Sequence, residues 1–162
     1  MRFFLRTGNH DMLLHMLTPD TKAPEFSLLD DTGSLRTLSE FSGKTVLLYF
    51  YPKDDTPGCT KEACMIRDAY GDYEKEGIVV LGVSADSVES HVAFKEKYQL
   101  PFILLSDQSK KMIKLYQADG LLMTKRISYL ISKDGIILKV YPDVDPATHA
   151  GEILKDIKSL IA

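Results

Sequence analysis

Apolar residues occur in short runs that alternate with stretches of helical spacing. Runs at 46–51 and 78–84 are typical of buried strands, and the first is apolar enough to be covered on both faces. A further short strand is expected at 102–105. Helical patterns lie between these runs, from Thr60 to about Glu76 and from Asp86 to about Tyr98. This alternation predicts an α/β fold with a mainly parallel sheet and helices on both of its faces.

Turn-forming residues predict a hairpin at each end of this pattern. Asp30-Asp31-Thr32-Gly33 separates two short extended segments within 26–38, which indicates an N-terminal β-hairpin. Strands expected at 127–131 and 136–141 flank a turn in which Gly135 supplies a positive φ. These hairpins add antiparallel strands, so the complete sheet is predicted to be mixed.

Capping residues and an apolar stripe locate the remaining helices. Asp86 is predicted to cap the second helix, with Glu89 at its third position. A short helix is expected at 110–116, followed by a loop at 117–125. Asp145-Pro146 is expected to begin the final helix. The apolar stripe of that helix consists of Ile153, Leu154, Ile157, Leu160 and Ile161.

Residues 1–16 differ from the rest of the chain. Met1–Arg6 begins like a signal peptide, but polar residues follow and no small-residue cleavage site is present. We expect an N-terminal extension or an upstream start codon, with the working chain beginning near Met12 or Met16. Residues 17–162 are expected to form a single domain, because no linker or internal repeat divides them.

The composition is that of an ordinary globular protein and argues against several functions. The 162 residues are 44% hydrophobic and 27% charged. A net charge of −3 gives no argument for nucleic acid, and no apolar run is long enough to span a bilayer. Two cysteines are too few for a secreted disulfide scaffold or a four-ligand zinc site, and no paired histidines lie near them. We expect a cytoplasmic protein that binds neither nucleic acid nor membrane.

Cys59 lies where the loop after the first central strand becomes a helix. The first N–H groups of a helix lack intrahelical partners, and the helix dipole adds partial positive charge there. A thiolate at such a position is stabilised, and a thiolate is both a nucleophile and a target for oxidants. The position therefore indicates a reactive thiol. The alternative is a buried, inert cysteine, which is the usual state of a free thiol.

Cys64 lies five residues after Cys59, and an intact helix keeps the two sulfur atoms apart. Side chains at this spacing point about 140° apart, and their Cα atoms are roughly 8.7 Å apart. A disulfide needs Cα atoms within about 7 Å. We predict a wound helix with free thiols and an unwound helix with the bond formed, in which Cys59 attacks and Cys64 resolves. If Cys64 is a spectator, an outside thiol must resolve the oxidised Cys59.

A distinctive motif surrounds these two cysteines. It consists of Phe50-Tyr51-Pro52 followed by Thr56-Pro57-Gly58-Cys59-Thr60-x-Glu62-x-Cys64-x-x-Arg67-Asp68. Later segments add Val80-Leu81-Gly82-Val83-Ser84, Tyr98-Gln99-Leu100-Pro101-Phe102, Leu104-Leu105-Ser106-Asp107, Arg126 and Asp134-Gly135. Together they resemble the atypical 2-Cys peroxiredoxins of the PrxQ or bacterioferritin-comigratory type. The resemblance covers roughly residues 17–161 and is specific, because it combines a Pro, a Thr, a Cys and a distant Arg.

The resemblance implies a thioredoxin-like fold and a thiol-dependent peroxidase that reduces hydrogen peroxide and organic hydroperoxides. Cys59 would become a sulfenic acid, Cys64 would close an intramolecular disulfide, and thioredoxin or a similar dithiol protein would reduce it. No metal, haem or flavin cofactor is expected, because sulfur carries the redox change. Proteins of this group are most often monomers. A homodimer formed through the hydrophobic N-terminal segment is the alternative.

Local sequence supplies part of the predicted active site. Thr56 lies three residues before Cys59, where its hydroxyl can reach the sulfur or a peroxide oxygen. Pro52 gives the loop a rigid apolar wall and donates no backbone hydrogen bond. The resemblance supplies the missing cation, Arg126, which stays charged and presents several donors. Neighbouring Lys125 is the competing candidate.

Several other residues have two interpretations. Glu62 is either a first-turn helix charge or a catalytic partner. The Arg67-Asp68 pair lies either near the site or on a solvated helix face. Tyr51 belongs to the sheet or lines the peroxide pocket, and His91 and His149 are expected on the surface.

Two rival functions remain at this point. A thiol–disulfide oxidoreductase would share the fold, but such proteins use Cys-x-x-Cys and a cis-proline beside the cysteine. This chain has Cys-x-x-x-x-Cys and no proline before the strand that begins at Arg126. A redox sensor or holdase whose unwinding helix exposes a partner surface is the second rival. It would be oxidised once and turn over poorly.

Overall fold

The computed structural model describes residues 17–161. The predicted extension at 1–16 lies outside the described residues, and so does the alternative dimer contact that would form through it. Within 17–161, no helix is both long and apolar enough to cross a membrane.

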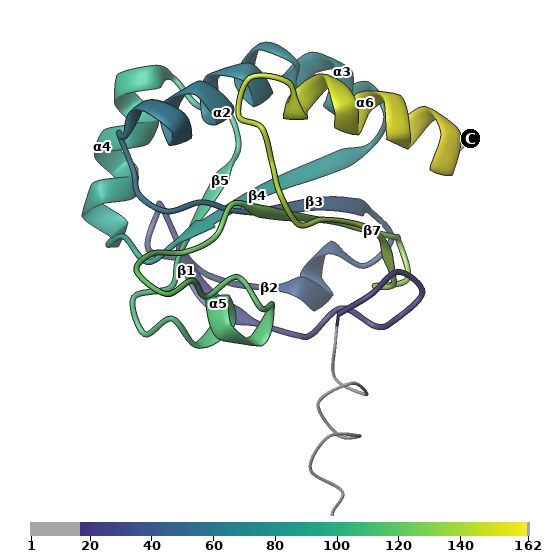
Figure 1. The fold of residues 1–162 in the computed structure, drawn as a ribbon, viewed down its shortest axis with the longest axis horizontal. Helices are drawn as coiled ribbons and strands as arrows, with labels where there is room; N and C mark the ends of the chain where they lie inside the picture. Colours follow the sequence, from purple (N-terminus) through teal and green to yellow (C-terminus); the bar gives the residue numbers. More distant parts are fainter. Residues whose placement is uncertain (1–16, 162) are drawn as a thin grey trace, which may run out of the picture.

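Seven strands form one sheet in the order β2-β1-β5-β4-β3-β6-β7 (Figure 1). The strands are β1 (Ser27–Asp30), β2 (Leu35–Thr37), β3 (Thr45–Phe50), β4 (Ile78–Ser84), β5 (Ile103–Ser106), β6 (Ile127–Ile131) and β7 (Ile137–Tyr141). The central strands β3, β4 and β5 pair in parallel, and the other pairings are antiparallel. The predicted mixed sheet with its N-terminal hairpin is confirmed. The expectation of a mainly parallel sheet is wrong, because both hairpins also join the central strands in antiparallel fashion.

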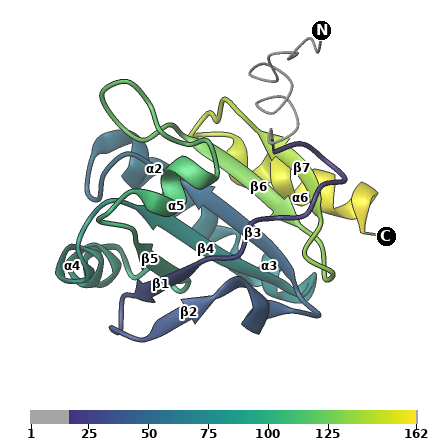
Figure 2. The same ribbon diagram turned by 90° about the horizontal axis from the view of Figure 1, so that it is seen from below.

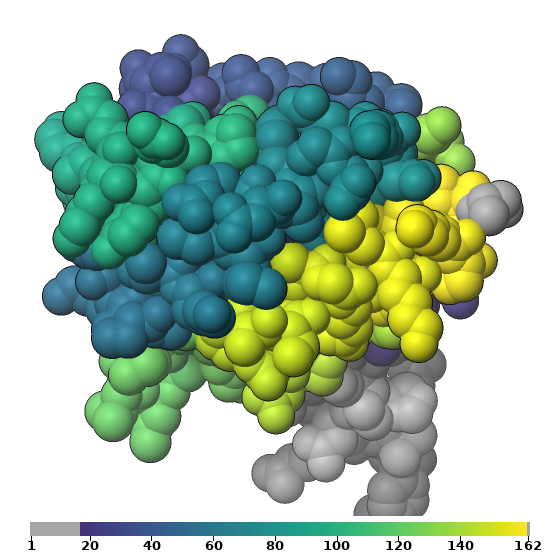
Figure 3. All heavy atoms as spheres, turned by 90° about the horizontal axis from the view of Figure 1, so that it is seen from above, coloured from purple at the N-terminus to yellow at the C-terminus, as the bar shows by residue number. Residues whose placement is uncertain are grey.

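Helices cover both faces of this sheet, as predicted. One face carries α2 (Pro57–Asp68), α3 (Tyr70–Lys75), α4 (Val88–Tyr98) and α6 (His149–Leu160). The opposite face carries α5 (Lys111–Leu115) and a 3-10 helix, Leu38–Phe41 (Figures 1 and 2). Figure 3 looks onto the first face, where α2 and α3 lie beside α6.

Strand β3 supplies the centre of the core on both faces, because its side chains alternate between them. Leu47 and Tyr49 pack under α2, α4 and α6, whereas Leu48 and Phe50 pack against α5 and the N-terminal segment. All four side chains are 1% exposed or less. The C-terminal end of this fully buried strand is therefore a rigid origin for the loop that follows it.

The helix expected from Thr60 to Glu76 is in fact two helices. It begins earlier, at Pro57, and the chain breaks at Ala69, where φ is −92° and ψ is 0°. Proline favours the first helical position because the missing N–H has no partner there and its φ is already helical. Tyr73 of α3 is buried in the same core as the apolar side chains of α2.

Two predicted helix starts are wrong. Ser87, and not Asp86, caps α4, because the Ser87 side chain accepts a hydrogen bond from the Ser90 N–H at 3.1 Å. The Asp86 carboxylate instead accepts a hydrogen bond from the backbone N–H of Asp54, in the loop after β3. The final helix begins at His149, and Asp145 forms the turn before it.

Candidate active site

The loop after β3 delivers Cys59 to the first turn of α2. Thr56 is extended, with φ −97° and ψ 155°, and Pro57 begins the helix. The first intrahelical hydrogen bond runs from the Thr60 N–H to the Thr56 carbonyl at 2.8 Å. The amides of Gly58 and Cys59 precede this bond, so they belong to the set of N–H groups that give a helix N-terminus its affinity for anions.

Arg126 reaches Cys59 from the residue just before β6. Its Nη2 lies 3.4 Å from the Cys59 Sγ. Gly58 makes this approach possible, because a Cβ on residue 58 would lie 3.0 Å from Nη2. Lys125, the competing cation, is exposed and does not line the cavity beside Cys59. Of the two candidates, the structure therefore brings Arg126 to the sulfur.

The other side of the Arg126 guanidinium faces Glu62. Nη1 lies 3.4 Å from Glu62 Oε1, and the Glu62 side chain is 1% exposed. Burial raises the pKa of Glu62 to about 7, against the opposing effect of Arg126. Glu62 therefore belongs to the site and is not a solvated helix charge. When Glu62 ionises, near neutral pH, its negative charge offsets part of the positive potential that Arg126 produces at the sulfur.

Two buried polar atoms close to this group have no hydrogen-bond partner among the described residues. They are Glu62 Oε2 and the Tyr49 hydroxyl. Burial raises the pKa of Tyr49, and the charges of Glu62 and Cys59 add to that effect. Tyr49 therefore stays protonated and supplies a neutral wall beneath the charged groups.

A cavity of about 440 Å³ opens beside Cys59. It is lined by Pro52, Lys53, Thr56, Cys59, Ala85, Lys110, Leu122, Met123, Thr124 and Arg126. The Thr56 hydroxyl donates to the Lys53 carbonyl at 2.8 Å, which leaves its oxygen free to accept a hydrogen bond. Cys59 itself is 2% exposed, so the sulfur is shielded from bulk water yet borders a space of substrate size.

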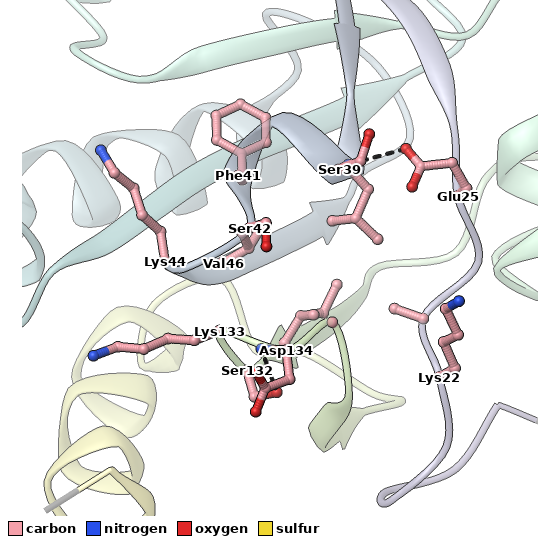
Figure 4. Close-up of a pocket in the computed structure, with 14 residues that line it drawn as sticks. Lys22, Glu25, Ser39, Phe41, Ser42, Lys44, Val46, Ser132, Lys133 and Asp134 are labelled. Atoms are coloured by element: carbon pink, nitrogen blue, oxygen red, sulfur yellow. Dashed lines mark hydrogen bonds between the residues drawn. The ribbon is translucent and has the colours of Figure 1, made fainter.

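A second cavity, of about 220 Å³, lies on the opposite face of the sheet (Figure 4). The 3-10 helix, the N-terminal segment and the β6–β7 turn line it, and the Ser39 N–H donates to Glu25 there. The side chains of Lys44 and Lys133 extend away from Lys22. No cysteine lines this cavity, and its lysines do not converge, so it offers no counterpart of the thiol beside the first cavity.

Cys64 lies on the same unbroken helix as Cys59 and does not line the cavity. Both cysteines are free, and Cys64 is half-buried. This arrangement corresponds to the predicted wound helix with free thiols. The unwound, disulfide-bonded form stays a prediction.

Two expectations about neighbouring residues are settled by contacts. Tyr51 does not line the cavity, because its hydroxyl points to Asp54. Arg67 pairs with the adjacent Asp68 and donates to the Tyr98 carbonyl at 2.7 Å. That second bond ties α2 to the end of α4, so the Arg67 side chain has a structural contact away from Cys59.

The two histidines expected on the surface are fully buried, and that expectation is wrong. His91 and His149 are both 0% exposed. His149 Nε2 lies 2.8 Å from the Ser128 hydroxyl, and burial lowers the pKa of His149. Helical spacing could have indicated both positions: His91 precedes Phe94 by three residues, and His149 precedes Ile153 by four, on the buried faces of their helices.

Comparisons with known sequences and structures agree with a reactive thiol at Cys59. The sequence profile of the AhpC/TSA family matches residues 19–140. The chain belongs to this family. It is 45% identical over 144 residues to the putative peroxiredoxin bcp of Coxiella burnetii, covering 82% of this chain and 93% of that protein. It is 40% identical over 158 residues to the chloroplastic peroxiredoxin Q of Oryza sativa subsp. japonica, covering 95% and 73%.

Solved structures of AhpC/TSA relatives have the same fold. A cysteine-to-serine mutant of Xylella fastidiosa PrxQ superposes with a TM-score of 0.85 at 28% identity, covering 90% of this chain and 98% of that one. Peroxidoxin BcpB of Mycobacterium tuberculosis gives 0.83 at 30% identity, covering 89% and 98%. These findings confirm the predicted thioredoxin-like fold and the peroxiredoxin Q and bcp type. The enzyme is a thiol-dependent peroxidase, and the findings do not favour a thiol–disulfide oxidoreductase or a redox sensor.

Proposed function

We propose that Cys59 is the sulfur that reduces peroxide in this enzyme. Its thiolate attacks one oxygen of the peroxide, the O–O bond breaks, and the electron pair leaves with the other oxygen. The leaving oxygen takes up a proton and departs as water or an alcohol, and the sulfur becomes a sulfenic acid. The observation that carries this assignment is the 3.4 Å contact between Arg126 Nη2 and the Cys59 Sγ at a helix N-terminus.

Three neighbours complete the proposed reaction site. Arg126 stabilises the thiolate and the charge that develops on the departing oxygen, since a guanidinium presents several donors at once. The Thr56 hydroxyl oxygen accepts a hydrogen bond from the peroxide, because its own hydrogen is already donated to the Lys53 carbonyl. Pro52 lines the same cavity and brings no N–H that would compete for the peroxide oxygens.

Resolution of the sulfenic acid requires a change of shape in this proposal. Cys64 attacks the Cys59 sulfur, water leaves, and an intramolecular disulfide forms. Both cysteines lie within the helix Pro57–Asp68, so its first turns must unwind for the two sulfur atoms to meet. A thioredoxin-type dithiol then restores both thiols by exchange.

The Cys64→Ser variant tests this second half of the cycle. We expect one rapid oxidation of Cys59 by peroxide, followed by slow cycling with thioredoxin, because the disulfide that thioredoxin reduces cannot form. Stopped-flow measurement of the first oxidation and a coupled thioredoxin assay separate the two effects. Mass spectrometry of the peroxide-treated wild type should show loss of two hydrogens within one chain. Unchanged cycling of Cys64→Ser would place the resolving thiol elsewhere.

An apolar tip on the loop between α5 and β6 lies at the mouth of the cavity. The tip comprises Leu121, Leu122 and Met123, which are 101%, 90% and 62% exposed. Figure 2 shows this loop projecting from the body of the domain. Leu122 and Met123 line the Cys59 cavity, whereas Leu121 does not. We propose that the alkyl group of an organic hydroperoxide lies against Leu122 and Met123.

A double variant, Leu122→Ser with Met123→Ser, tests this subsite. We expect kcat/KM for cumene hydroperoxide to fall roughly tenfold, since each methylene that leaves water contributes about 0.8 kcal/mol. The value for hydrogen peroxide should not change, because that substrate has no apolar part. Leu121→Ser is the control, because it removes an exposed apolar side chain from the same loop but outside the cavity. Equal losses for both peroxides would refute the subsite.

We also propose that residues 17–162 act as one catalytic domain, in the cytoplasm and as a monomer. The resemblance to the peroxiredoxin Q and bcp group supports a monomer. Sedimentation of the reduced and the oxidised protein measures the oligomeric state directly, and a dimer in either state would overturn this part of the proposal.

A further inference from the structure

His91 is a fully buried histidine whose two ring nitrogens both face acceptors. Nδ1 lies 2.7 Å from Asp54 Oδ2, and Nε2 lies 3.0 Å from the Leu105 carbonyl oxygen. A carboxylate and a carbonyl cannot donate a hydrogen, so each ring nitrogen must carry one. The contacts therefore require an imidazolium cation at His91, paired with the Asp54 carboxylate.

Asp54 lies in the loop after β3 and is 7% exposed. Its Oδ1 accepts a hydrogen bond from the Tyr51 hydroxyl at 2.6 Å, and its Oδ2 also accepts one from the Ser90 hydroxyl at 2.8 Å. Its backbone N–H donates to Asp86 Oδ2 at 2.9 Å. Asp54 is thus held by Tyr51 just after β3, by Ser90 of α4 and by Asp86 in the loop between β4 and α4.

The charged groups that face His91 are two carboxylates, Asp54 and Asp86, which lie close enough to it to hold a cation. Asp86 Oδ2 accepts hydrogen bonds from the Asp54 backbone N–H at 2.9 Å and from the Ser84 hydroxyl at 2.6 Å. His91 therefore supplies the positive charge at this place. Burial alone lowers the pKa of His91, but the hydrogen bond and charge of Asp54 outweigh it and raise that pKa above 6.5.

One peptide unit connects this pair to the cavity. The N–H of Asp54 and the carbonyl of Lys53 belong to the same planar peptide group. The N–H donates to Asp86, and the carbonyl accepts the hydrogen bond from the Thr56 hydroxyl. The network that fixes Asp54 therefore also fixes the direction in which the Thr56 oxygen presents its free lone pairs.

We propose that the buried His91–Asp54 ion pair is a positioning device for the loop 52–56, which keeps the Thr56 hydroxyl aimed at the peroxide beside Cys59. His91 is then a positioning residue, because it acts through Asp54 and does not touch the substrate. The inference rests on the proposed roles of Cys59 and Thr56. It goes beyond them by assigning a positioning role to a buried side chain remote from the sulfur.

Two substitutions of His91 separate positioning from packing. Asparagine places its amide nitrogen where Nδ1 stood and keeps the hydrogen bond to Asp54. Glutamine places its amide nitrogen where Nε2 stood and keeps only the bond to Leu105. We expect His91→Gln to slow oxidation of Cys59 by hydrogen peroxide about tenfold or more, since small misplacements in a site are costly. His91→Asn should stay within about threefold of wild type.

A packing role predicts the opposite order, because asparagine leaves the larger void. A His91→Gln rate equal to or above that of His91→Asn would therefore overturn the proposal. If Cys59→Ser still consumed peroxide, the proposed function itself would fail, and that outcome is distinct from a wrong order of the two His91 variants.

The protonation state gives a readout that does not depend on activity or on the folding of variants. In a nitrogen-15 NMR titration of the wild type, both ring nitrogens of His91 should be protonated below a pKa that lies above the ordinary histidine value, and a pKa lowered by burial would refute the ion pair. Because the folded pKa is raised, the pair stabilises the protein fully below pH 6.5 and loses this effect as pH rises through the folded pKa. In Asp54→Asn, the amide can donate to Nδ1, so we expect a neutral ring and loss of this pH dependence.

Discussion

Replacing Cys59 by serine is expected to reduce peroxide consumption to the level of buffer alone. A serine hydroxyl does not ionise at neutral pH, and its oxygen cannot form a counterpart of the sulfenic acid. The helix N-terminus and Arg126 would remain in place, so the loss would report the sulfur itself. Hydrogen peroxide consumption in the presence of thioredoxin, thioredoxin reductase and NADPH provides the measurement.

The matched control is the same change at the second cysteine. Cys64→Ser removes an equal volume of sulfur from the same helix but leaves Cys59 in its cavity. It should retain the first oxidation, whereas Cys59→Ser should lack it. Turnover by Cys59→Ser at a rate near that of wild type would reject Cys59 as the reacting thiol.

Replacing Arg126 by methionine should lower the rate constant for oxidation of Cys59 by roughly 10²–10³, the typical cost of losing a donor that stabilises developing charge. The guanidinium contacts the Sγ at 3.4 Å in a shielded site, so both the thiolate and the departing oxygen lose stabilisation. Arg126→Lys should recover only part of the rate, because an ammonium is a point charge without the planar fork. Stopped-flow fluorescence or competition with a peroxidase measures this constant.

Lys125→Met is the control for this prediction. It removes one positive charge at the adjacent residue, but Lys125 is exposed and lies outside the cavity. Its rate should stay within about twofold of wild type, because exposed charges are screened by solvent. Equal losses in the two variants would show that net charge, and not contact with the sulfur, is responsible.

The Arg126→Met variant is expected to fold, which makes its kinetics interpretable. Removing Arg126 leaves Glu62 buried without its charged partner. Burial already raises the pKa of Glu62 to about 7, so the carboxyl can take up a proton instead of remaining an unpaired charge. Circular dichroism at pH 6 and pH 8 checks this, and the variant should be less stable at the higher pH.

The sequence predicted well those features that depend on neighbours along the chain. The apolar run at 46–51, the Pro and Gly residues after it and the helical spacing beyond placed Cys59 at a helix start, and the structure has it in the first turn of α2. The two hairpin turns were equally local, and Gly135 adopts the expected positive φ, as Gly33 also does. The prediction of the α4 cap was wrong, because Asp86 and Ser87 are adjacent and both residue types commonly cap helices.

By itself, the sequence determined the strand, the loop and the helix that bring a cysteine to a cluster of free backbone amides, because hydrogen bonds and side-chain spacing within a few residues decide these elements. Local sequence did not supply the cation that meets the sulfur; the family resemblance named Arg126, and the packing of β6 against β3 brings it to Cys59. The tertiary structure also decided that His91 is a buried charge and not a surface residue, because burial and the partner Asp54 come from different parts of the chain. Such contacts depend on how elements pack, and no short segment of sequence contains that information.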